Sequence, residues 1–256
     1  MDAKAPLWID NTMVSLGLIL AIGLALIHSF ATQLPIFSII PRFRWISFAG
    51  GVSLGYVFID ILPELSHAQE ELQHAEIPLV QYLENHVYIL ALMGLLLFYG
   101  LDLLALRSRS VRQAQGQIQD SSATIFWLHI ITFALLNAIL GYLLQDMSRH
   151  HDLLACLLFF VAIALHLFVI DENLREHYQT LYDKQGRWLL VAAIIAGAIA
   201  GQAALFDEAA ISIVWSFLAG SIILNVLNRE LPDEKENCFF SFLGGATVFT
   251  ILLLLI

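Results

Sequence analysis

The sequence predicts an all-α membrane protein with eight transmembrane helices, forming a single transmembrane domain over residues 1–256. The first observation is composition, because 59% of the residues are hydrophobic and only 13% are charged. A globular chain usually carries about a quarter charged residues. The second observation is that the apolar residues form continuous runs of about 20, the length that crosses a bilayer as a helix. These runs lack the short alternating pattern of transmembrane β-strands.

Eight apolar segments follow one another along the chain. They cover residues 14–31, 45–66, 86–106, 123–145, 152–171, 188–206, 209–228 and 238–256. The first is expected to be a retained helix, because the residues before it lack the basic region of a cleavable signal peptide.

Basic residues predict the orientation, since cytoplasmic loops are enriched in Lys and Arg. If the eight segments alternate in direction, ten of the twelve basic residues fall on one side. These ten are Arg42, Arg44, Arg107, Arg109, Arg112, Arg175, Lys184, Arg187, Arg229 and Lys235. Both termini are therefore expected on the non-cytoplasmic side. Segment 67–85 then forms an acidic outer segment, as a loop or as a short interfacial helix, and segment 107–122 forms a flexible cytoplasmic connection.

An internal repeat links the second and seventh segments. Residues 45–65 and residues 215–234 both contain Trp, then Ser-Phe, Ala-Gly and, further on, an acidic residue followed by Leu-Pro and another acidic residue. The two segments run in opposite directions, so the repeat has inverted topology, with spans 1–3 echoed by spans 6–8 around spans 4–5. Inverted repeats of this kind are typical of secondary transporters. Chance similarity is the alternative, because small residues and Pro are common in membrane helices.

Composition also argues against several classes of function. The net charge of −10 argues against nucleic acid as a partner. Two cysteines are too few for a disulfide framework or a Cys-rich metal site. The sequence shows no nucleophile–base arrangement, phosphate loop or haem motif, so we expect neither an enzyme nor a tightly bound cofactor.

Two carboxylates in the second span are candidate cation ligands. Asp60 and Glu64 are four residues apart and share one face of a helix. Pro63 between them loosens the helical hydrogen bonds and frees carbonyl oxygens, which together with carboxylates suit a hard cation. The alternative is a helix end at the outer interface, which fits Glu64 better than Asp60.

Further polar residues lie in spans 4 and 5. His166 and Asp171 occupy the inner half of the fifth span, and imidazole with carboxylate suits zinc and similar metals. Asp171 could instead pair with Arg175, four residues later. His129 and Asn137 share one face of the fourth span and are interpreted as forming hydrogen bonds between helices. Asp102, near the end of the third span, is expected to reach the interface.

These segments resemble the ZIP family of metal-ion transporters. The stretch AGGVSLGYVFIDILPEL is similar to the second ZIP span, with Asp60 at the position of a family His, and Pro63 and Glu64 matching directly. The stretch HLFVIDENL resembles the fifth span: His166 matches the first family His, and Asp171 falls on a family Glu. LAGSIILNVLNRELP and the following Gly-Gly helix resemble the last two spans. The fourth span departs from the family pattern.

The resemblance implies a transporter of a divalent, zinc-like cation, with a reduced metal site formed by Asp60, Glu64, His166 and Asp171. The metal would be a transported substrate. The partners implied are membrane lipids and the metal ion, and Gly- and Ala-rich faces would allow a homodimer. The alternative is a non-transporting scaffold or partner-binding subunit on the same fold.

Overall fold

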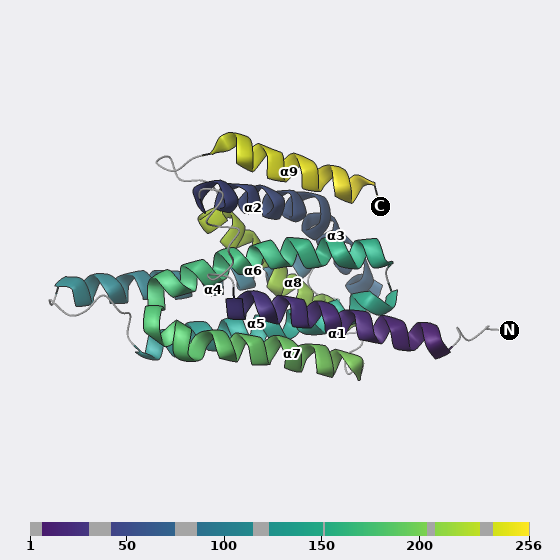
Figure 1. Cartoon of the computed structure of the whole chain (residues 1–256), viewed down its shortest axis with the longest axis horizontal. Coiled ribbons are helices and arrows are strands. Elements are labelled where there is room, and N and C mark those ends of the chain that lie inside the picture. The colour runs from purple at the N-terminus through teal and green to yellow at the C-terminus, as the bar shows by residue number, and fades with distance from the viewer. Residues whose placement is uncertain are drawn as a thin grey trace.

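The computed structural model describes residues 7–30, 42–74, 86–114, 123–150, 152–203, 208–230 and 238–255. Within these ranges every regular element is a helix and none is a strand (Figure 1). The predicted all-α class is therefore confirmed for the described part of the chain.

The described elements are nine α-helices and three short π-helical turns, which are labelled η. In chain order the elements are α1 Leu7–Phe30, α2 Arg42–Tyr56, η3 Val57–Ile61, α3 Leu62–His74, α4 His86–Ala114, α5 Ala123–His150, α6 Leu153–Leu181, η5 Tyr182–Gly186, α7 Arg187–Gln202, α8 Glu208–Asn225, η6 Val226–Glu230 and α9 Phe239–Leu254.

Among the described residues, five helical stretches are long and apolar enough to cross a membrane. They are Phe43–Glu70, His86–Leu104, Ala123–His150, Leu153–Gln202 and Ala209–Asn228. Two shorter apolar helices, Leu16–Phe30 and Phe239–Leu254, accompany them. The 50-residue stretch Leu153–Gln202 is interrupted at Gln179, whose φ is 41°, and beyond this break the chain turns back as α7 (Figure 1).

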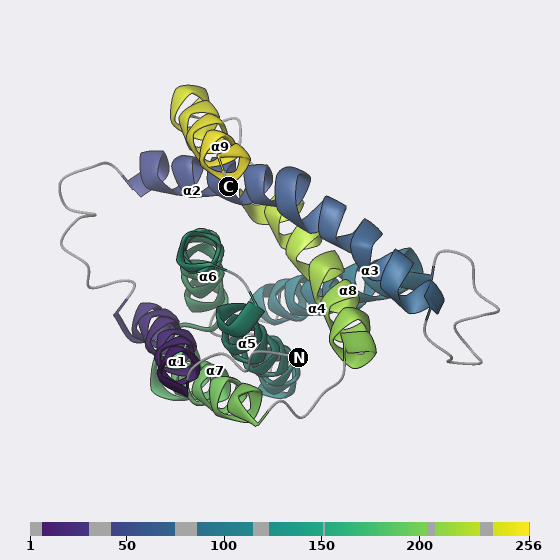
Figure 2. The ribbon, with the colours of Figure 1, turned by 90° about the vertical axis from the view of Figure 1, so that its right-hand side faces the viewer.

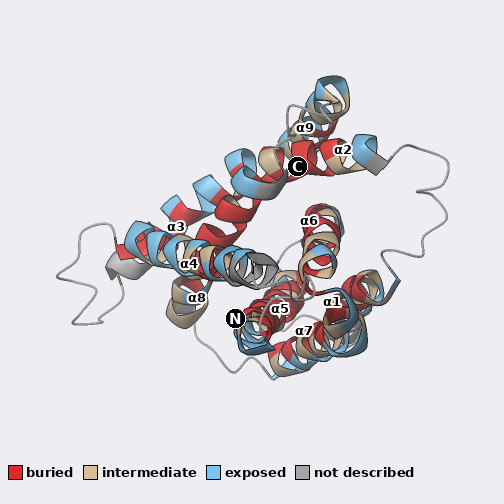
Figure 3. Ribbon diagram, turned by 90° about the vertical axis from the view of Figure 1, so that its left-hand side faces the viewer, coloured by how far each residue is buried: buried red, intermediate tan, exposed pale blue. Residues whose placement is uncertain are grey.

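The distribution of polar and apolar side chains is also that of a membrane protein. Large apolar side chains point outward, as in Leu92, Leu96, Ile131 and Leu135, all more than half exposed. Polar side chains such as Asn137 are instead buried between helices, and Figure 3 shows the buried positions facing the interior. A water-soluble monomer rarely exposes apolar surface in this way, whereas lipid favours it.

Close helix pairs organise the bundle: α5 packs on α7, α2 on α9, and α4 on α8. Glycine permits the closest approaches. A β-carbon at Gly197 of α7 would lie 1.8 Å from the carbonyl oxygen of Ala138, and one at Gly220 of α8 would lie 1.8 Å from that of Ala91. In the view of Figure 2, α6 lies between the α2–α9 pair and the group formed by α1, α5 and α7.

The two segments of the predicted repeat share an unusual local structure. η3 directly follows α2, and η6 directly follows α8. In η3 the Leu62 N–H donates to the carbonyl of Val57, five residues earlier. Pro63 explains this widening, because it has no N–H to donate and its ring crowds the preceding turn.

Several predicted boundaries differ from the structure, because helices continue beyond the apolar segments. The segment 107–122 was expected to be a flexible connection, but α4 continues to Ala114, because nothing in 107–114 breaks a helix and its polar side chains can be solvated. The second span continues as α3 to His74, so the described part of the acidic outer segment is helical, one of the two structures expected for it. The rest of both connections, 75–85 and 115–122, lies outside the described residues.

A candidate cation site between three helices

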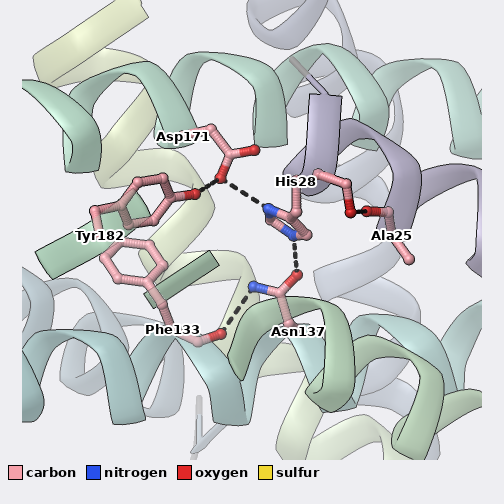
Figure 4. Close-up of polar contacts among 7 residues, drawn as sticks. Ala25, His28, Phe133, Asn137, Asp171 and Tyr182 are labelled. Atoms are coloured by element: carbon pink, nitrogen blue, oxygen red, sulfur yellow. Dashed lines mark hydrogen bonds and ion pairs between the residues drawn. The ribbon is translucent and has the colours of Figure 1, made fainter. Parts of the chain in front are cut away.

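A buried His–Asp pair joins the end of α1 to the middle of α6 (Figure 4). His28 lies in the last turn of α1, and its Nδ1 is 2.7 Å from Oδ1 of Asp171. His28 is 3% exposed and Asp171 is 2% exposed. An isolated charge at such a position is costly, so a carboxylate there needs a charged or hydrogen-bonding partner.

Asn137 of α5 fixes the orientation of the imidazole. Its Nδ2 donates to the carbonyl of Phe133 at 2.9 Å, one turn earlier in the same helix. Its Oδ1 therefore faces His28 and lies 2.7 Å from Nε2. Because an amide oxygen only accepts, Nε2 of His28 must carry a hydrogen and donate it to Asn137.

Tyr182 of η5 provides the fourth side chain of this site, and its hydroxyl donates to Oδ1 of Asp171. The other carboxylate oxygen, Oδ2, is buried and has no hydrogen-bond partner among the described residues. We call His28, Asn137, Asp171 and Tyr182 the central site. It brings together α1, α5 and α6 with η5, the turn that directly follows α6.

The structure places the four predicted ligands in different environments. Asp171 belongs to the central site, and His166 is buried on the same helix, α6. Asp60 is half-buried in η3, and Glu64 is exposed on α3. Within the described ranges, no group of three or more His, Cys, Asp or Glu is arranged to hold a metal ion. The structure thus joins Asp171 to His28.

Sequence reasoning missed two members of the central site. His28 could have been noticed, since it stands alone in a run of apolar residues, LILAIGLALIHSF. Its partner Asp171 is 143 residues away, so no local spacing connects them. Tyr182 gave no signal, because it lies in a polar segment that reads as a helix exit.

A second buried pair joins α5 to α4. In this second pair, Nε2 of His129 is 3.3 Å from Oδ1 of Asp102 on α4. Nδ1 of His129 is 2.7 Å from the hydroxyl of Tyr178 on α6. The predicted hydrogen bonds between helices are thereby confirmed for both His129 and Asn137. The side chain of Asp102, expected to reach the interface, is 13% exposed and faces His129.

The four-residue spacing allowed Arg175 to pair with Asp171. In the structure Arg175 pairs with Asp183 instead. Its Nε and Nη2 donate to Oδ1 of Asp183 at 2.9 and 2.7 Å. The break at Gln179 explains the difference, because it bends the chain back and brings Asp183 beside the last turns of α6. Asp171 is left free to face His28.

The donor atoms of the central site are an imidazole nitrogen, a carboxylate and a phenol oxygen. Imidazole and carboxylate bind zinc and related divalent metals, and a ligating histidine commonly donates its other N–H to an oxygen, as His28 does to Asn137.

No family model matches the chain, and no curated protein matches it either.

Proposed function

We propose that this chain is a multi-pass membrane transporter of a divalent, zinc-like cation, and that its substrate site is the central site. The observation that carries the proposal is the His28–Asp171 contact, in which a carboxylate and an imidazole from different helices meet inside an apolar bundle. Ionisable residues at such positions are costly and commonly mark ion or substrate pathways.

The proposed topology has eight spans, with both termini outside, and an inverted repeat. The π-helical turns η3 and η6 support the repeat, because they follow α2 and α8, the two helices that carry the Trp and Ala-Gly motif. Helix pairing supports it as well. If spans 1–3 correspond to spans 6–8, the α2–α9 pair corresponds to the α8–α4 pair, and both are close. Alternating access would then come from movement of the repeats around α5 and α6.

The proposed route begins at Asp60, the half-buried carboxylate of η3, and leads to the central site. There a cation would bind Nδ1 of His28 and the carboxylate of Asp171, with the hydroxyl of Tyr182 next to them. Asn137 would hold the imidazole in place without binding the cation. This is a reduced set of ligands, which favours a site that binds and releases its cation rather than one that retains it.

The experiment that tests this proposal measures zinc, cadmium and manganese uptake into proteoliposomes that contain the purified protein. We expect saturable uptake by the wild type and a loss of at least about tenfold in Asp171→Asn, because Asn cannot supply the charge that a divalent cation needs. Asp60→Asn should reduce uptake as well.

The matched control is Asp146→Asn on α5, the same chemical change at a carboxylate that pairs with His150 one turn away, at 3.7 Å. We expect this variant to transport normally. If folded wild-type protein takes up none of the three metals, the transporter proposal fails and the scaffold alternative takes its place.

A further inference from the structure

We propose that Asp102 and His129 form a second binding site for the same divalent cation, between α4 and α5. We call these two residues the second site. The inference rests on the proposed function and deepens it, because a second site divides the passage of the cation through the bundle into two steps.

One ring nitrogen of His129 is buried and lacks a hydrogen bond. The residue is 2% exposed, and its Nδ1 lies 2.7 Å from the hydroxyl of Tyr178. Its Nε2 makes no hydrogen bond within the described ranges, and it faces Oδ1 of Asp102. A buried polar atom without a hydrogen bond is costly and calls for an explanation. A nitrogen of this kind beside a carboxylate oxygen is an available ligand for a cation.

The distance between the two atoms suits a shared cation better than a hydrogen bond. Nε2 of His129 and Oδ1 of Asp102 are 3.3 Å apart, whereas N–H···O hydrogen bonds usually measure about 2.7–3.2 Å. Zinc holds nitrogen and oxygen ligands at about 2.0–2.2 Å in tetrahedral geometry, which places two ligand atoms about 3.3–3.5 Å from each other. A cation can therefore join these two side chains without a large movement of α4 or α5.

Tyr178 of α6 orients the imidazole of His129. A ligating histidine commonly bonds to an oxygen through the ring nitrogen that does not touch the metal, and the hydroxyl of Tyr178 provides this oxygen. The ring of Tyr178 stands at 89° to the imidazole, and Phe133 packs on the imidazole with ring centroids 5.2 Å apart. These contacts hold Nε2 toward Asp102.

Two connections place the second site next to the central site along the route. His129 and Asn137 are eight residues apart on α5, which corresponds to about 12 Å of helix. Tyr178 and Tyr182 are four residues apart, after and before which the chain turns at Gln179. In the proposed topology α5 starts at the cytoplasmic side, so the second site lies between the central site and the cytoplasm.

The second site is expected to bind the cation more weakly than the central site. It supplies one imidazole and one carboxylate, whereas the hydroxyl of Tyr182 adds an oxygen beside the carboxylate of the central site. The central site therefore fills first, and the second site fills when the cation is in excess. A pathway for ions needs sites that release what they bind, and weak binding at the last site favours release.

The test counts the zinc ions bound to the purified full-length protein in detergent by equilibrium dialysis, with zinc in excess. We expect about one zinc fewer per protein in His129→Ala and in Asp102→Asn than in the wild type. Zinc retained at the central site shows that each variant has folded. The control His177→Ala removes a histidine whose Nδ1 bonds to the carbonyl of Asn173 within α6, and should bind as many zinc ions as the wild type.

A third variant, Tyr178→Phe, distinguishes a cation site from a structural ion pair. It keeps both ligands and removes the oxygen that orients the imidazole. We expect the number of zinc ions to stay the same and the affinity of the second site to fall by about 10- to 100-fold. A His129–Asp102 pair with a structural role alone would leave zinc binding unchanged in all three variants.

The outcomes separate this inference from the proposed function. If His129→Ala and Asp102→Asn bind as many zinc ions as the wild type while His28→Ala binds one fewer, the second site is overturned and the transporter proposal stands. Loss of one zinc in His129→Ala but not in His28→Ala would overturn the central site and leave the second. Absence of zinc binding in the folded wild type would overturn both.

Discussion

At the scale of single residues, Asn137 has the most specific role among the uncharged side chains. It makes one hydrogen bond to the carbonyl of Phe133 and one to His28. The first bond sets which end of the amide faces the imidazole, and the second sets which imidazole nitrogen faces Asp171. Such supporting contacts commonly govern the affinity of a metal site although they do not touch the metal.

Replacing Asn137 by Leu tests this role. The Nε2–H of His28 would lose its acceptor inside the bundle, so we expect a loss of stability of about 1 kcal/mol and zinc binding that is weaker by about 10- to 100-fold. Thermal unfolding in detergent and zinc titration measure the two effects. Thr132→Val on the same helix is the control, because its hydroxyl bonds to the carbonyl of Leu128, within the same helix. Equal zinc affinity in Asn137→Leu and the wild type would contradict the role.

At the scale of helices, the bundle depends on small residues at the pair contacts. The α4–α8 pair approaches so closely that a β-carbon on Gly220 would overlap the carbonyl oxygen of Ala91. For Gly244 on α9, no neighbouring atom of the described residues lies within 4 Å of the same position. The two glycines therefore allow a direct comparison between a packed and an open position.

Gly220→Ala should separate α4 from α8 and lower the free energy of unfolding by about 1–3 kcal/mol, the usual effect of overpacking. Gly244→Ala should be neutral or slightly stabilising, because Ala favours a helix by up to about 1 kcal/mol over Gly. Size-exclusion chromatography of detergent-solubilised protein after heating compares the two. If Gly244→Ala were the more damaging change, the helix pairing described above would be wrong.

The sequence was most informative about where the helices lie along the chain. Apolar runs of about 20 residues mark spans because hydrocarbon thickness sets their length, and α5, α7 and α8 lie where such runs predict them. Polar helix extensions carry no comparable signal, so the continuation of α4 to Ala114 was missed. The break at Gln179 could not be foreseen either, because Gln is not a residue that ordinarily marks a reversal.

At the scale of the whole molecule, the central site depends on contacts that the sequence cannot specify. Asp171 was predicted as a ligand from its place near His166 in the inner half of the fifth span and from the family resemblance. Its neighbours were not identified, because His28 and Tyr182 reach it only through packing of α1 on α6 and the return of the chain at η5. The four ligands expected from the family resemblance lie on η3, α3 and α6, and a metal site formed by all four remains a prediction.

X-ray absorption at the cadmium edge, recorded on the purified protein with one equivalent of cadmium, tests the central claim most directly. The claim is that the cation binds between His28 and Asp171. We predict a shell of nitrogen and oxygen ligands with imidazole scattering, and loss of the imidazole signal in His28→Ala. The control variant His150→Ala removes an exposed histidine and should leave the spectrum unchanged. A spectrum that is the same in the wild type and in His28→Ala would show that the cation binds elsewhere and would contradict the proposed site.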